Sequence, residues 1–142
     1  METRVRAPSS PHIEWPGVPA TNNWIRAFEW IRQNTPCDAV FAIDPEYMRR
    51  DDEHGFRAIA ERSRLADAVK DSGAVTMFPQ PPFAEDWLEQ LTAERGWDHF
   101  RKADLLRLKS RYGAEWAVLE RPGIAGLACP YENPSVLVCR VE

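Results

Sequence analysis

The chain has 142 residues, of which 44% are hydrophobic and 28% are charged, and its formal net charge at pH 7 is −4. These values are ordinary for one globular domain, and the length is sufficient to bury a core without disulfides or metals. The acidic balance argues against nucleic-acid binding, because phosphate contacts need clustered Lys and Arg. No apolar run approaches the roughly 20 residues needed to cross a bilayer, so we expect no direct membrane span.

Residues 1–21 are interpreted as an extended arm or linker. Four prolines lie in this segment, and proline at that density disfavours both helices and interior strands. They are Pro8, Pro11, Pro16 and Pro19. The segment also lacks the apolar stretch of a secretory signal peptide. A single α/β domain is predicted over residues 22–142.

A helix is predicted at the start of this domain. Asn22 or Asn23 can cap it, because an asparagine side chain accepts hydrogen bonds from the N–H groups of the first turn. Apolar residues then recur at helical spacing, at Trp24, Phe28 and Ile31.

A buried strand is predicted to follow this helix. Pro36 pushes Thr35 out of the helical conformation and so ends the helix. Residues 39–43 are an apolar run without alternation, which is typical of a strand covered on both faces. Asp44 follows at the carboxyl end of the strand, which is where open α/β sheets place their ligands.

The middle of the chain has weaker patterns. Residues 46–62 favour a helix, and residues 63–69 favour a second strand with Leu65 on one face. A turn is predicted at residues 70–73 and a third short strand at residues 74–78.

The second half of the chain predicts two helices, at residues 83–95 and 102–112, and then three strands. The strands are expected at residues 116–119, 127–131 and 136–141, and the last two form a hairpin. The apolar residues of the first of these helices share one face: Phe83, Trp87, Leu88 and Leu91. The whole order predicts an α/β fold, with α+β as the alternative. We expect a mixed sheet of about five strands with helices packed on it.

The acidic residues after the first strand are the strongest candidates for a metal site. The candidate ligands are Asp44, Asp51, Asp52 and His54, with Glu46 and Glu53 beside them. Oxygen ligands suit Mg²⁺ or Ca²⁺. The favoured alternative is a solvated helix start, where carboxylates are stabilised by the helix dipole, because no fixed metal-ligand spacing is present. We therefore expect no cofactor.

Three more polar residues lie near the end of the second predicted strand. Asp67, Lys70 and Asp71 could face the same crevice as Asp44, although turn formation explains their pattern better. No serine elbow and no phosphate-binding glycine pattern is present in the sequence. No catalytic residue is therefore assigned.

Cys37, Cys129 and Cys139 do not form a disulfide framework or a zinc motif. Cys129 and Cys139 lie on opposite arms of the predicted hairpin, and they could join in an oxidising compartment. The odd count favours the alternative, in which they are two small unbonded residues on a sheet.

One stretch resembles a known family. From Trp24 to Phe41 the succession W-x-x-x-F-x-W-I-R-x-N-T-P-x-D-A-V-F resembles the start of a soluble domain in bacterial multi-pass membrane proteins. That domain is the C-terminal, extracytoplasmic one of the GT-C glycosyltransferase-like type. Residues 104–118, from Asp-Leu-Leu to Glu-Trp-Ala-Val, resemble its passage from helix to strand. The resemblance extends over about residues 22–142.

This resemblance implies an accessory, non-catalytic domain on the extracytoplasmic side of the inner membrane. It implies that the partner is the transmembrane portion of the same parent chain. The catalytic acid of such enzymes lies in the membrane portion, so no catalytic residue is transferred to this chain. A complete chain of 142 residues would instead predict a cytoplasmic protein.

Two further functional hypotheses remain open from the sequence. One is a small metal-binding or hydrolase-like domain that uses the acidic residues near Asp44. The other is a protein-interaction module that presents exposed tryptophans, which would require an apolar surface patch of a few hundred Å².

Overall fold

The computed structural model describes residues 22–47, 55–68, 71–72 and 81–142. The strands are β1 (Val40–Ile43), β2 (Ser63–Arg64), β3 (Ala114–Glu120), β4 (Ala128–Glu132) and β5 (Val136–Arg140). The helices are α1 (Asn23–Asn34), α3 (Phe56–Ala60), α5 (Pro81–Ala93) and α6 (Lys102–Tyr112), with a short 3-10 helix at Trp97–His99.

The strands form one mixed sheet in the order β2-β1-β3-β5-β4. β1 pairs in parallel with both β2 and β3, while β5 pairs antiparallel with both β3 and β4. The α/β class, the five-stranded mixed sheet and the C-terminal hairpin predicted from the sequence are therefore confirmed.

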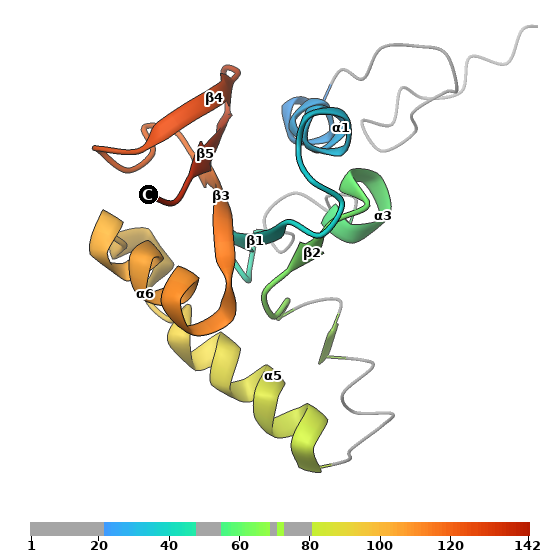
Figure 1. Ribbon diagram of the computed structural model, residues 1–142, viewed down its shortest axis with the longest axis vertical. Helices are drawn as coiled ribbons and strands as arrows, with labels where there is room; N and C mark the ends of the chain where they lie inside the picture. Colours follow the sequence, from blue (N-terminus) through green and yellow to red (C-terminus); the bar gives the residue numbers. More distant parts are fainter. Residues whose placement is uncertain (1–21, 48–54, 69–70, 73–80) are drawn as a thin grey trace, which may run out of the picture.

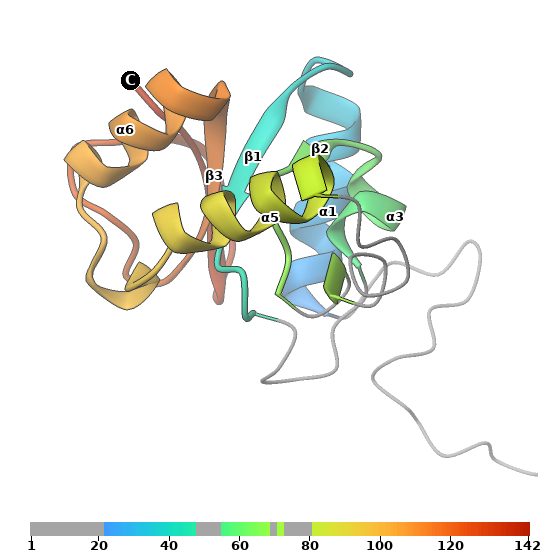
Figure 2. The same ribbon diagram turned by 90° about the horizontal axis from the view of Figure 1, so that it is seen from below.

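Helices cover both faces of this sheet. α1 and α3 lie on one side and α6 lies on the other, as two perpendicular views show (Figures 1 and 2). Alternate residues of β1 enter the two resulting cores: Phe41 and Ile43 contact the α1 side, and Ala42 contacts the α6 side. This placement explains why the strand reads as an unbroken apolar run.

The start of α1 agrees with the sequence prediction. The Asn22 side chain accepts hydrogen bonds from the backbone N–H groups of Trp24, at 2.8 Å, and Ile25, at 3.5 Å. At the other end Thr35 has an extended backbone, so the helix ends before Pro36 as predicted. Trp24, Phe28 and Ile31 are buried on the sheet side.

The carboxyl end of α1 is held by an arginine from the segment before β2. Arg62 donates through Nη2 to the carbonyl oxygens of Arg32 and Thr35, both at 2.7 Å, and through Nε to the Thr35 hydroxyl at 3.1 Å. The last carbonyls of a helix have no partner within the helix, and the positive guanidinium also suits the negative end of the helix dipole.

We expect the Arg62→Ala substitution to lower the free energy of unfolding by about 1–3 kcal/mol, because charge-assisted hydrogen bonds to backbone carbonyls are lost. Urea denaturation monitored by circular dichroism measures the change. Arg111→Ala is the control, since Arg111 makes an exposed ion pair with Glu89 at 2.6 Å, and it should cost less than about 1 kcal/mol. Equal losses in the two variants would contradict this role of Arg62.

β2 is much shorter than the strand predicted at residues 63–69. Leu65 N–H still donates to Phe41 O at 3.0 Å, but the next acceptor along β1, Ile43 O, receives the Arg64 guanidinium at 3.2 Å instead. Asp67 N–H then donates to Asp71 Oδ2 at 2.9 Å. The pairing with β1 therefore stops because side chains replace the ladder partners.

The other predictions for the middle of the chain are only partly tested. The helix predicted at residues 46–62 is shorter in the structure, where α3 spans five residues, Phe56–Ala60. Of the predicted turn at residues 70–73, Asp71 and Ser72 are described, and both have helical backbones. The strand predicted at residues 74–78 lies outside the described residues.

α5 is only partly covered by the rest of the protein. Phe83 and Leu88 are 55% and 57% exposed, whereas Trp87 and Leu91 are half-buried. The apolar face predicted for this helix is therefore not a core face along its whole length. Within the described ranges, every helix is too short or too polar to cross a membrane.

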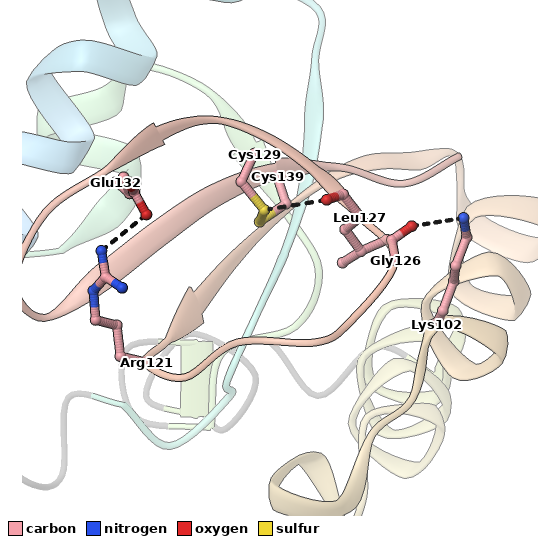
Figure 3. The surroundings of a disulfide bond; sticks show 7 residues. All are labelled: Lys102, Arg121, Gly126, Leu127, Cys129, Glu132 and Cys139. Atoms are coloured by element: carbon pink, nitrogen blue, oxygen red, sulfur yellow. Dashed lines mark hydrogen bonds and ion pairs between the residues drawn. A yellow bond between two sulfur atoms is a disulfide. The ribbon is translucent and has the colours of Figure 1, made fainter.

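The C-terminal hairpin contains a disulfide bond. Cys129 of β4 and Cys139 of β5 are bonded, with their Cα atoms 3.9 Å apart (Figure 3). The unbonded pair that the sequence favoured is therefore wrong, because the antiparallel pairing places the two side chains next to each other. Cys37 is a free, exposed thiol.

The hairpin is also attached to its neighbours by polar contacts. Lys102 Nζ at the start of α6 donates to Gly126 O at 2.8 Å, and Arg121 forms an ion pair with Glu132 at 2.9 Å (Figure 3). At its turn, Asn133 donates to Asn23 O at 2.7 Å and so joins the hairpin to the start of α1.

Candidate functional site

The candidate site lies at the carboxyl ends of the parallel strands. From β1 the chain passes through α3 to β2 on one side of β1, and then through α5 and α6 to β3 on the other side. The connections therefore diverge between β1 and β3. Open α/β sheets bind ligands in the crevice that such a divergence leaves.

Asp44 occupies this position, directly after β1. Its side chain is buried, and its Oδ1 atom accepts a hydrogen bond from the Glu46 backbone N–H at 2.9 Å. The Tyr47 N–H donates to the Asp44 carbonyl oxygen at 3.2 Å. Asp44 therefore shapes the turn that carries the chain away from the sheet edge.

A buried ion pair lies beside Asp44, at the end of β2. Arg64 and Asp67 approach to 3.3 Å, with only 1% and 3% of their side chains exposed. The same guanidinium donates to the carbonyl oxygens of Ile43 and Asp44, and it lies over the Tyr47 ring, 5.2 Å from its centre. Since the donors of Arg64 are distributed among these groups, the arginine fixes the geometry of the sheet edge.

The third group is Glu94, which follows the last residue of α5. Glu94 is fully buried, and neither carboxyl oxygen has a hydrogen-bond partner in the part of the chain that the structure describes. Burial raises the pKa of Glu94 to about 8, Arg64 opposes that rise, and the negative charges of Asp44 and Asp67 add to it. At neutral pH the side chain is therefore a protonated carboxylic acid.

Two pockets meet at this edge of the sheet. One has a volume of about 320 Å³ and is lined by Asp44, Glu46, Leu91, Glu94, Trp97 and Asp98, among others. The other, of about 170 Å³, lies between Asp44 and the end of β3 with the segment that follows it, residues 118–124. Asp44, Trp97 and Asp98 line both pockets.

The predicted metal site is only partly described. Asp44 lies at the strand end as predicted, whereas Asp51, Asp52 and His54 fall outside the described residues, as does Glu53. The described ranges contain no group of three potential metal ligands close enough to hold an ion. The acidic metal site stays a prediction.

The residues predicted near the end of the second strand, Asp67, Lys70 and Asp71, are only partly described in the structure, and the two aspartates pair with different arginines. Asp67 is buried and close enough to Glu94 to affect its pKa, as Asp44 is, so both aspartates act on one group. Asp71 instead forms an ion pair with Arg57 at 2.8 Å. Lys70 lies outside the described residues. Asp67 does not line either of the two pockets at Asp44, so a crevice shared by the two aspartates stays a prediction.

Sequence reasoning missed Glu94 and Arg64. A signal for Glu94 exists, because it follows Trp87 by seven residues and Leu91 by three, which places a carboxyl group on the apolar side of α5. No comparable pattern marks Arg64, since two of its acceptors, the carbonyl oxygens of Ile43 and Asp44, lie about 20 residues away in the sequence.

Comparison with known proteins adds one match. The profile of a family described as a domain of unknown function, DUF6798, matches residues 22–82, fewer than half of the chain. This segment begins at the cap of α1 and ends in the first turn of α5. No curated protein and no solved structure matches the chain.

Proposed function

We propose that this chain is an accessory, non-catalytic domain on the extracytoplasmic side of a bacterial inner membrane, belonging to a GT-C glycosyltransferase-like protein. Its partner in this proposal is the transmembrane portion of the same parent chain. The observation that carries the proposal is the disulfide bond between Cys129 and Cys139.

The disulfide supports the location outside the cytoplasm. Disulfides form and persist in oxidising compartments and are rare in the cytosol, where thiols are kept reduced. The bond joins two adjacent strands of the sheet, and Cys139 is fully buried, so the bond belongs to the folded domain rather than to its surface. An accidental surface pairing would not have this placement.

The membrane-protein part of the proposal rests on the sequence. The residues from Trp24 to Phe41 resemble the beginning of an extracytoplasmic domain of the GT-C type, and they correspond to α1 and the start of β1. That unit carries the buried aromatic contacts Trp24–Phe28 and Phe28–Phe56. The resemblance therefore concerns residues that build the core, and this agrees with a structural role for the segment.

Cys37 provides a direct test of the location, because its thiol is free and exposed. In intact cells that make the protein, we expect a membrane-impermeant maleimide to label Cys37, and we expect the protein in the membrane fraction. After denaturation without reduction, one thiol should react, and reduction should expose two more. The Cys37→Ser variant is the control and should stay unlabelled in intact cells.

Two results would contradict the proposal. One is labelling of Cys37 only after cell lysis, which would place the domain in the cytoplasm. The other is three reactive thiols in freshly isolated, unreduced protein, which would remove the observation on which the location depends.

A further inference from the structure

Glu94 is the least satisfied polar group among the described residues. Its side chain is fully buried, and both carboxyl oxygens lack hydrogen-bond partners there. Leaving a buried acceptor unsatisfied costs about 1–3 kcal/mol, and native proteins keep few such groups. A buried group of this kind calls for a partner that the described residues do not supply.

Space for such a partner adjoins this residue. Glu94 lines the pocket of about 320 Å³ at the carboxyl ends of the parallel strands. This volume lies within the range of small-molecule sites. The position also agrees with the general rule for ligands in open α/β sheets.

The other lining residues indicate the chemistry of the ligand. Three more carboxylate residues line the same pocket, at Asp44, Glu46 and Asp98, and the half-buried Trp97 adds an aromatic ring. Carboxyl groups accept hydrogen bonds and attract positive charge, and an indole ring attracts cations through its face. Arg95 is the one basic residue in the lining.

We propose that this pocket binds a small organic cation, a primary ammonium or guanidinium group. Its N–H groups donate hydrogen bonds to the Glu94 carboxylate. The cation fills the unmet hydrogen-bonding capacity of the buried side chain and pairs with its charge. This inference does not depend on the cellular compartment, so it can fail while the proposed function holds, and the reverse is also true.

Binding and protonation are coupled in this site. A cation is bound by the charged form of Glu94, so the proton must leave as the ligand enters. Arg64 and Arg57 favour that charged form, and Asp44 and Asp67 oppose it. Below pH 8 we expect the affinity to rise about tenfold per pH unit, and we expect up to about one proton to be released per ligand bound.

Calorimetric titration with putrescine and agmatine tests the proposal, with 1,4-butanediol as the uncharged match of putrescine. The expected result is saturable binding of at least one diamine, no binding of the diol, and proton release that is visible as a difference between two buffers. Glu94→Gln should weaken binding at least about tenfold, since the amide cannot provide the charge. Glu85→Gln, an exposed change on α5, should leave it unaltered.

Several results would overturn the inference. If neither amine saturates the protein at concentrations up to about 10 mM at pH 8, the proposed amine-binding site is excluded. Equal binding by Glu94→Gln, with wild-type circular dichroism, would mean that the cations bind elsewhere on the acidic surface. Stronger stabilisation by Ca²⁺ or by a neutral sugar than by the amines would assign the pocket to a different class of ligand.

Discussion

Replacing Glu94 by glutamine is expected to remove most of the pH dependence of stability between pH 4.5 and 8. The pKa of Glu94 is about 8 in the folded protein, against an ordinary value of 4.5. In this interval the folded state keeps a proton that the unfolded state has released. The free energy of unfolding therefore falls as the pH rises, and it levels off above pH 8.

The size of this effect is large for a single side chain. Each unit of pKa difference corresponds to about 1.4 kcal/mol, so the wild-type protein loses about 3 kcal/mol between pH 4.5 and pH 7. Above pH 8 the loss amounts to about 4–5 kcal/mol. Glutamine has nearly the same shape and does not ionise, so the Glu94→Gln protein should match the wild type at pH 5 and exceed its stability at pH 8.

Urea denaturation of both proteins at pH 5, 6, 7 and 8 measures the difference. Glu85→Gln, on the helix that precedes Glu94, is the matched control, because Glu85 is exposed, and its profile should follow that of the wild type. Parallel profiles for the wild type and Glu94→Gln would show that Glu94 is not the buried titrating group.

The Arg64→Met substitution is expected to lower the free energy of unfolding by about 3–5 kcal/mol, because it removes the buried ion pair between Arg64 and the Asp67 carboxylate. Arg64 also donates to the carbonyl oxygens of Ile43, Asp44 and Ala66, and these contacts are lost as well. Part of the loss comes from the buried Asp67 charge, which no longer has Arg64 beside it. The double variant Arg64→Met/Asp67→Asn should therefore recover about 1–3 kcal/mol.

A matched control for this pair exists on α6. Arg107 and Asp104 are also three residues apart and approach to 3.0 Å, but 58% and 29% of their side chains are exposed. Arg107→Met should cost less than about 1 kcal/mol, because water and salt screen the pair. Similar losses at Arg64 and Arg107, or no recovery in the double variant, would contradict the importance of burial.

The local parts of the fold could be predicted from the sequence. The helix from Asn23 and the strand to Ile43 are specified by a cap, an apolar stripe, a proline stop and a short apolar run. α6 and its end at Gly113, which has a φ of 73°, are specified by similar local signals. Each of these signals lies within the element that it determines.

The parts that sequence reasoning missed depend on distant contacts. β2 ends early because Arg64 takes the carbonyl of Ile43, a residue 21 positions away. The disulfide depends on how β4 and β5 pair, which a count of cysteines does not show. In the site, Asp44 was found because a strand end has a sequence pattern. The environment of Glu94 arises only when α5 is placed against the sheet.

The position of β1 in the sheet has a consequence for the segment that matches DUF6798. β1 and β2 belong to residues 22–82, but the other neighbour of β1 is β3, which lies outside that range. The core beneath α1 likewise contains Trp116, Val118, Val136 and Val138. A fragment cut after residue 82 would turn a central strand into an open edge and expose one side of its helix. The matching segment is therefore not an autonomous folding unit, and the C-terminal hairpin completes it.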